Sequence, residues 1–216
     1  MRTLVKNATF VKDEFRKNDR RYVAMVNKIY ALIGPFASGR RTLAMQLSRI
    51  GVHYIPTYTT KPTDPKDTHP GLFRPLPQEE FDKQDFILRA SYQGFYYGLT
   101  KTDVLQALKN YHASIIILDT GSIAPLSRLL RENLVTIYLM VDYVTLVSRM
   151  LTMGCTNDDI KYQLEYAESN KLFDTWKETT YVVKNTHDPH VALEQILALM
   201  GLMHLLPSEE LNMKLH

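Results

Sequence analysis

A glycine-bounded turn between an apolar run and an amphipathic segment constrains the fold of this chain more than any other feature. Residues 28–33 (KIYALI) are typical of a short buried β-strand, and the run ends at Gly34. From Arg40 onward, apolar residues fall on one face of a predicted helix: Leu43, Leu47 and Ile50. The segment GPFASGRRT therefore joins a strand directly to a helix. This is the setting in which a loop binds phosphate through backbone N–H groups.

The rest of the chain alternates between apolar runs and helical patterns. Residues 114–118 and 135–141 are continuous apolar runs, as in strands buried on both faces of a parallel sheet. Residues 78–84 predict a brief helix, and residues 85–98 predict a β-rich stretch that turns at Gln93-Gly94. Further helices are predicted over 101–110, 125–132, 144–151, 157–176 and 189–200, with a short strand over 181–184. This order predicts a parallel α/β sheet flanked by helices.

Composition limits the size and the setting of the protein. With 216 residues, 45% of them hydrophobic, the chain can bury one substantial core. A single cysteine, Cys155, excludes a disulfide framework and predicts a cytoplasmic location. The apolar runs are too short to span a membrane, and the histidines have no metal-ligand spacing. We therefore expect neither a membrane anchor nor a metal centre built from protein ligands.

The amino-terminal segment is basic. Residues 1–28 carry eight Lys and Arg against three Asp and Glu, a balance that suits an acidic partner or nucleic acid. Its apolar side chains favour a helix packed on the domain edge instead: Phe10, Phe15, Tyr22 and Val26. Nucleic acid is not the predicted partner, because the chain has no aromatic stacking motif. We divide the chain into a basic extension (1–27), one domain (28–200) and a tail (201–216).

The loop almost fits the phosphate-binding pattern G-x-x-x-x-G-K-[ST]. Arg40 stands at the lysine position, where it keeps the charge but is larger and forked. Arg41 stands at the position of the hydroxyl that holds magnesium, and it cannot ligate a cation; Thr42 is the nearest hydroxyl. The backbone cradle depends little on side chains, so we predict that phosphate binds at Gly34, Ala37, Ser38, Gly39, Arg40, Arg41 and Thr42. The alternative is a tight turn that binds nothing.

Several segments, in order along residues 28–200, resemble guanylate kinase. The loop beginning Gly34-Pro35 resembles that family's G-P-S-G-x-G-K-S-T. The other matching segments are Thr59-Thr60-Lys61 with Pro65-Lys66-Asp67, Tyr96-Tyr97-Gly98, Ile117-Leu118-Asp119 and Val183-Lys184-Asn185. No single motif is decisive, but their order and spacing are hard to produce by chance.

The resemblance implies a P-loop nucleoside monophosphate kinase-like α/β fold. This fold is a parallel sheet flanked by helices, with a small β-rich substrate-binding lobe (about 57–98) and a helical lid (about 149–176). ATP and magnesium are the implied cofactors, although Arg41 argues against the metal. By the same resemblance, Arg40 and Arg149 take catalytic, phosphate-binding positions, and Asn185 lies near the adenine site. The implied substrate-binding residues are Thr57, Lys61, Lys66, Phe73, Tyr97 and Thr100.

Several functional positions depart from the family pattern. Leu88 and Gly121 stand where the family has the acids that read guanine, so guanine specificity is not expected. Met153 and Gln163 stand at lid arginines, and Phe73 lacks a tyrosine hydroxyl. The first hypothesis is a protein that binds a nucleotide, another phosphorylated small molecule or a protein partner, with weak or no ATP:GMP phosphotransferase activity. The alternative is an active nucleoside monophosphate kinase with altered base preference.

Overall fold

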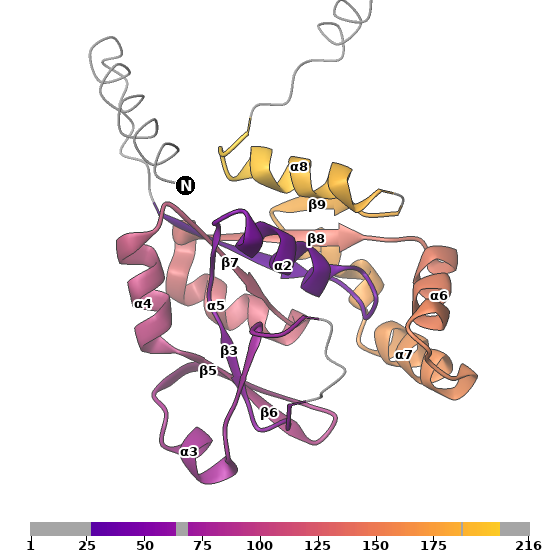
Figure 1. The fold of residues 1–216 in the computed structure, drawn as a ribbon, viewed down its shortest axis with the longest axis horizontal. Coiled ribbons are helices and arrows are strands. Elements are labelled where there is room, and N and C mark those ends of the chain that lie inside the picture. The colour runs from indigo at the N-terminus through magenta and orange to yellow at the C-terminus, as the bar shows by residue number, and fades with distance from the viewer. Residues whose placement is uncertain (1–26, 64–68, 187, 204–216) are drawn as a thin grey trace, which may run out of the picture.

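The computed structural model describes residues 27–63, 69–186 and 188–203, which form two sheets surrounded by helices (Figure 1). The larger sheet has five parallel strands. Their spatial order is β2 (His53–Tyr54), β7 (Ala113–Ile117), β1 (Lys28–Ile33), β8 (Leu134–Met140) and β9 (Tyr181–Lys184). The parallel sheet predicted from the alternating apolar runs is confirmed.

Helices cover both faces of the larger sheet, as the apolar strand sequences require. On one face, Tyr30 and Leu32 of β1 pack in a core with α2 (Arg40–Arg49) and α8 (Pro189–Leu199). On the other face, Ile29 and Ile33 pack with α4 (Lys101–Asn110) and α5 (Ile123–Leu130). Alternate residues of one strand thus supply two cores, because successive side chains of a strand point to opposite faces.

The smaller sheet lies below the larger one in Figure 1 and falls within the predicted substrate lobe. Its four strands are, in spatial order, β4 (Phe73–Pro75), β3 (Thr57–Thr59), β6 (Phe95–Thr100) and β5 (Phe86–Tyr92). The hairpin β5–β6 turns at Gln93 and Gly94, which both have positive φ (50° and 78°). The short helix α3 (Gln78–Asp82) precedes β5.

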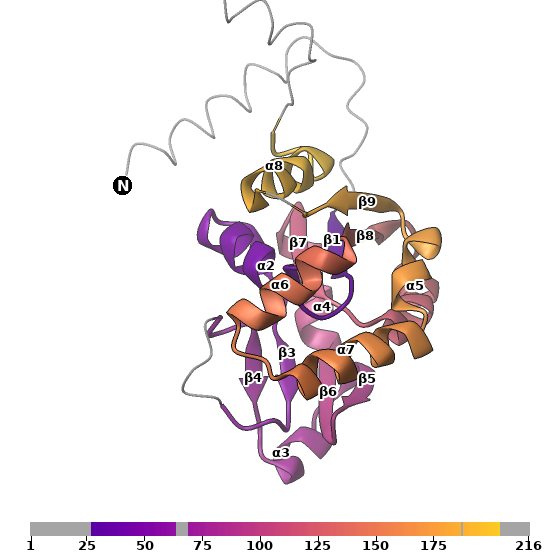
Figure 2. The ribbon, with the colours of Figure 1, turned by 90° about the vertical axis from the view of Figure 1, so that its right-hand side faces the viewer.

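The segment predicted as a helical lid (about 149–176) covers the end of α6 (Tyr143–Thr152), all of α7 (Asn157–Ser169) and part of a following 3-10 helix. Helices α6 and α7 lie beyond the carboxyl end of β8 (Figure 1, Figure 2). They share a separate apolar core of Val141, Leu146, Met150, Ile160 and Leu164. Phe36 and Ala37 of the loop pack against this core. The lid therefore rests directly on the glycine-bounded loop.

Two predicted helix boundaries are wrong. The helix expected over 157–176 divides into α7 and a 3-10 helix, Leu172–Glu178, because Lys171 adopts a left-handed conformation with φ 53°. The helix expected over 125–132 begins earlier, at Ile123, after a short 3-10 turn. Asp119 caps that turn by accepting a hydrogen bond from the Ser122 backbone N–H (2.9 Å). The helical segment therefore begins earlier than the start predicted from the proline at 125.

Two apolar residues of the predicted helices are exposed. Ile50, placed on the same helix face as Leu43 and Leu47, is 57% exposed, because the helix ends before it and Ile50 serves as the carboxyl cap. Leu105 of α4 is 54% exposed, whereas Val104 and Ala107 of the same helix are buried.

The basic extension lies outside the described residues except for Asn27, as does Lys66, and the tail is described only to Met203. Among the helices of residues 27–63, 69–186 and 188–203, none has the length and apolar character needed to cross a membrane.

Gly98 of β6 yields the first testable prediction. A Cβ on Gly98 would lie 2.5 Å from the Phe86 ring, inside van der Waals contact. Gly98→Ala should therefore destabilise the fold by about 1–3 kcal/mol through overpacking, measured as a lower midpoint in urea unfolding. The double variant Gly98→Ala/Phe86→Leu makes room and should recover part of the loss. An unchanged midpoint for the single variant would show that the ring moves aside freely.

Candidate functional site

The loop between β1 and α2 presents an uncapped helix amino terminus. Gly39 stands at the amino cap of α2 with φ 94°, a left-handed conformation that favours glycine, and no side chain hydrogen bonds to the cap. Gly34 allows close approach, since a Cβ there would lie 2.7 Å from Ser38 Oγ and 3.1 Å from the Leu139 carbonyl oxygen. The first N–H groups of a helix lack intrahelical acceptors, so this geometry suits an anion.

Asn185 holds the loop in place through a side-chain hydrogen bond. It is 2% exposed, and its side-chain amide donates a 2.8 Å hydrogen bond to the Ser38 carbonyl oxygen. Its backbone N–H donates to the Met140 carbonyl oxygen (2.8 Å), which continues the β8–β9 pairing. A Cβ on Gly39 would collide with the Asn185 amide. The residue expected near the adenine site thus lies against the loop and fixes its shape.

Arg149 links the lid to the same loop. Its guanidinium donates to the carbonyl oxygens of Asn185 (2.7 Å) and Ala37 (3.3 Å). Burial lowers the pKa of Arg149 while Asp142 opposes the change, and the guanidinium stays charged. In this arrangement Arg149 fastens α6 to the loop; its phosphate-binding role stays a prediction.

The Arg40 side chain reaches the end of β7. Its guanidinium donates a 3.3 Å hydrogen bond to the Leu118 carbonyl oxygen. Burial lowers the pKa of Arg40, and the charge of Asp119 and the hydroxyl of Tyr138 act in the opposite direction. Asp119 lies close enough to influence Arg40 although its own oxygens bond Ser122. The cation at the lysine position therefore lies at the carboxyl edge of the sheet.

Arg41 reaches into the smaller lobe. The carbon of its guanidinium lies 5.4 Å from the centroid of the Phe73 ring, and Phe73 meets Tyr97 edge-on, with centroids 5.9 Å apart. Burial raises the pKa of Tyr97 and of Tyr54, and the charge of Arg41 opposes both changes. The Thr57 side chain acts on Tyr54 in the same direction as Arg41. The structure thus gathers Arg41 with three predicted substrate residues, Thr57, Phe73 and Tyr97.

Other predicted substrate residues lie elsewhere. The Lys61 ammonium lies 6.0 Å from the centroid of the Phe95 ring, and the side chain is exposed. Thr100 caps α4: its hydroxyl accepts from the Asp103 backbone N–H (3.2 Å) and donates to the Asp103 carboxylate (2.5 Å). Lys66 lies outside the described residues.

The side chains of the loop do not fit a protein-bound magnesium ion. Arg41 occupies the hydroxyl position, and the Thr42 hydroxyl shares a 3.1 Å hydrogen bond with His69 Nε2. Within the described ranges, no three His, Cys, Asp or Glu residues cluster as metal ligands would. Magnesium prefers oxygen ligands in octahedral geometry, and this loop offers a guanidinium in that place. The backbone of the loop, by contrast, does not depend on these side chains.

A lid–lobe contact was missed by the sequence reasoning. The Tyr92 hydroxyl of β5 donates to the Gln163 side-chain oxygen of α7 (3.1 Å), and the Tyr92 and Tyr166 rings meet edge-on at 5.4 Å. Gln163 stands where the resemblance places a lid arginine. The only available signal was the position of Tyr92 directly before the Gln93-Gly94 turn, which does not indicate a partner on a distant helix.

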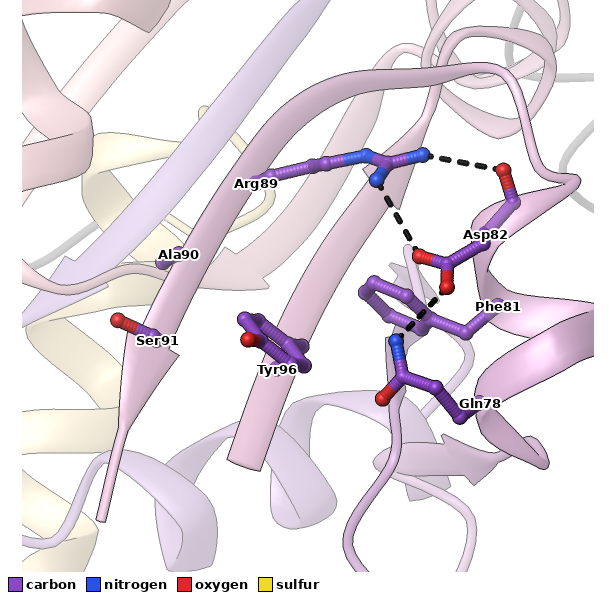
Figure 3. Close-up of a pocket in the computed structure, with 7 residues that line it drawn as sticks. All are labelled: Gln78, Phe81, Asp82, Arg89, Ala90, Ser91 and Tyr96. Atoms are coloured by element: carbon purple, nitrogen blue, oxygen red, sulfur yellow. Dashed lines mark hydrogen bonds and ion pairs between the residues drawn. The ribbon is translucent and has the colours of Figure 1, made fainter. Parts of the chain in front are cut away.

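A separate pocket of about 500 Å³ lies on the other face of the smaller sheet (Figure 3). Arg89 and Tyr96 line it, and by strand alternation they point away from Tyr97. The Arg89 guanidinium forms an ion pair with the Asp82 carboxylate (N–O distance 3.6 Å), and its central carbon lies 5.1 Å from the Phe86 ring centroid. These contacts hold α3 against the sheet, so we assign this pocket a supporting role.

Comparison with solved structures defines the class of the fold. The chain is similar to a guanylate kinase from Anaplasma phagocytophilum, with a TM-score of 0.60 and 19% sequence identity, over 82% of this chain and 85% of that chain. A shikimate kinase from Bacteroides thetaiotaomicron matches with a TM-score of 0.45 and 12% identity, over 81% of this chain and 98% of that chain. No protein-family model matches the sequence, and no curated protein sequence does.

The fold is therefore similar to that of a guanylate kinase: a parallel sheet flanked by helices, with a smaller mixed sheet beside it. The guanylate kinase resemblance of the sequence motifs agrees with the first of these structures. At 19% identity the likeness establishes the fold and leaves the activity open.

Proposed function

We propose that this protein binds a nucleotide or another phosphorylated ligand at the loop of residues 34–42, with weak or no ATP:GMP phosphotransferase activity. One observation carries the proposal. The strand–loop–helix junction keeps the two glycines and the left-handed cap that a phosphate cradle needs, and the lysine and magnesium hydroxyl are replaced by arginines.

The support for binding is the construction of the loop. The Asn185 amide and the Arg149 guanidinium hold the carbonyl oxygens of Ser38 and Ala37. These bonds fix the loop before any ligand arrives, so its N–H groups are arranged in advance. A preorganised site binds more tightly because less ordering is needed on binding.

The support for weak transfer is the loss of charge-stabilising groups. Phosphoryl transfer depends on positioned cations and metal ions more than on covalent chemistry. Here Arg40 is hydrogen bonded to Leu118, Arg41 points into the smaller lobe, and Gln163 replaces a lid cation. We propose that ligand phosphates bind without a magnesium ion held by the loop.

The second prediction tests binding by thermal unfolding of the full chain. ADP in EDTA should raise the stability by about 2.7 kcal/mol at one hundred times its dissociation constant, and added magnesium should change this little. Adenosine, which lacks phosphate, serves as the matched control and should have a much smaller effect. A melting temperature that neither ADP nor ATP moves, with or without magnesium, would refute the binding proposal.

A strict requirement for magnesium would favour the alternative, an active nucleoside monophosphate kinase with altered base preference. In that case the metal would be held by groups other than the loop hydroxyl, and ADP in EDTA would leave the melting temperature unchanged. The same titration thus separates the two functions.

A further inference from the structure

We infer that a latch between Tyr92 of the β5–β6 hairpin and Gln163 of α7 controls how fast a ligand enters and leaves the loop site. The Tyr92 hydroxyl donates to the Gln163 side-chain oxygen (3.1 Å), and the ring of Tyr92 meets that of Tyr166 edge-on, with centroids 5.4 Å apart. The inference rests on the proposed function, because it concerns the regulation of the same site. It departs from the family resemblance, which implies a phosphate-binding arginine at position 163.

The first argument is the side of the hairpin on which Tyr92 lies. In the β5–β6 register, Ala90 is opposite Tyr97 and Ser91 is opposite Tyr96. Side chains alternate between the two faces of a strand, so Tyr92, two residues after Ala90, shares the face of Tyr97. That face carries a predicted substrate residue, and Tyr96 lies on the other one. Tyr92 therefore reaches α7 on the side of the lobe where a ligand is expected.

The second argument is that α6 and α7 are attached to the loop as well. Phe36 and Ala37 pack against the apolar core of these two helices, to which α7 contributes Ile160 and Leu164. The Arg149 guanidinium of α6 also donates to the Ala37 carbonyl oxygen (3.3 Å). Figure 2 shows α7 running across the top of the smaller sheet. The latch thus joins the smaller lobe to the loop by way of α7.

The third argument is that the latch is weak enough to open. It lies at the tip of the hairpin, directly before the turn at Gln93 and Gly94. At the base of the hairpin, by contrast, Leu88 and Leu99 pack with a core of the larger sheet. One hydrogen bond and one aromatic pair each shift an equilibrium by up to about tenfold. The tip can therefore separate from α7 while the base of the lobe stays in place.

The test is stopped-flow binding of ADP that carries a fluorescent N-methylanthraniloyl group, in EDTA, to the full chain. Tyr92→Phe removes the hydroxyl and keeps the ring. Because the latch forms with and without the ligand, the association and dissociation rate constants should both rise by about three- to tenfold, and Kd should change by less than about twofold. Gln163→Leu should have the same effect, and the double variant should add nothing to either. Tyr96→Phe, which loses a hydroxyl from the opposite face of the hairpin, should behave as wild type.

A second measurement needs no ligand. Spin labels at Ser91→Cys and Lys161→Cys, both at exposed positions, report the separation of the hairpin from α7. The chain carries Cys155→Ser as well, since Cys155 is its single cysteine. With Tyr92 in place, the distance distribution should contain one short population. Tyr92→Ala removes the hydrogen bond and the ring contact together, so a longer population should dominate.

Unchanged rate constants in both Tyr92→Phe and Gln163→Leu would overturn the inference, as would a single short distance in Tyr92→Ala. Faster dissociation alone, with a weaker affinity, would also overturn it, by showing that Tyr92 contacts the ligand itself. Failure of the fluorescent ADP to bind wild type would count against the loop proposal, and the distance measurement would still decide whether the latch exists.

Discussion

Phosphorylation of GMP by this protein is expected to run at least about 10⁴-fold below the ordinary kinase range of roughly 1–100 per second. Removing one preorganised donor typically costs about a hundred- to thousandfold in rate. If the resemblance to guanylate kinase holds position by position, this chain lacks the loop lysine, the magnesium hydroxyl, the lid cations at Met153 and Gln163, and the guanine acids at Leu88 and Gly121. Such losses are not additive, but two independent ones already reach about 10⁴-fold.

The measurement is ADP release in a coupled assay with ATP, magnesium and saturating GMP. Arg40→Lys/Arg41→Ser restores the lysine and the magnesium hydroxyl and should recover part of the turnover. Wild-type turnover within the ordinary kinase range would refute the account of impaired transfer.

The second large effect is expected at Gly39. Gly39→Ala forces a Cβ into a left-handed conformation and against the Asn185 amide. If the loop binds phosphate as proposed, the resulting shift of the loop displaces the N–H groups that would hold the anion. Loss of two such charge-assisted bonds should weaken ADP binding by roughly 10²-fold or more, measured by titration calorimetry.

Gly154→Ala is the matched control for Gly39→Ala. Gly154 also has a positive φ (79°), but a Cβ there meets nothing within 4 Å. Both variants should lose about 1–2 kcal/mol of stability from left-handed strain, and only Gly39→Ala should lose ADP affinity. Equal ADP affinity in the two variants would show that the loop does not contact the ligand.

The large-scale fold was predictable from the sequence because its strands are fully buried. The runs at β1, β7 and β8 are apolar on both faces, a pattern that is typical of a parallel sheet covered by helices. The loop was predictable for a similar reason, since its glycines mark backbone conformations that other residues disfavour.

The side-chain contacts of the site were not predictable, because they depend on residues far apart in the chain. The Arg41–Phe73 contact joins α2 to β4, and the Tyr92–Gln163 hydrogen bond joins β5 to α7. No local pattern states where a long side chain points. The break after Ser169 was also not predictable: the polar segment is compatible with a helix throughout, and nothing in the local sequence marks Lys171 for its left-handed conformation.

The most direct test of the central claim follows the backbone amides of residues 37–42 by ¹H–¹⁵N NMR during titration with ADP in EDTA. If the loop cradles phosphate without a metal ion, these amides should show the largest shifts in the chain, and adenosine should leave them in place. The account would be contradicted if ADP shifted other amides, such as those around Arg89 and Tyr96, while the loop amides remained unchanged.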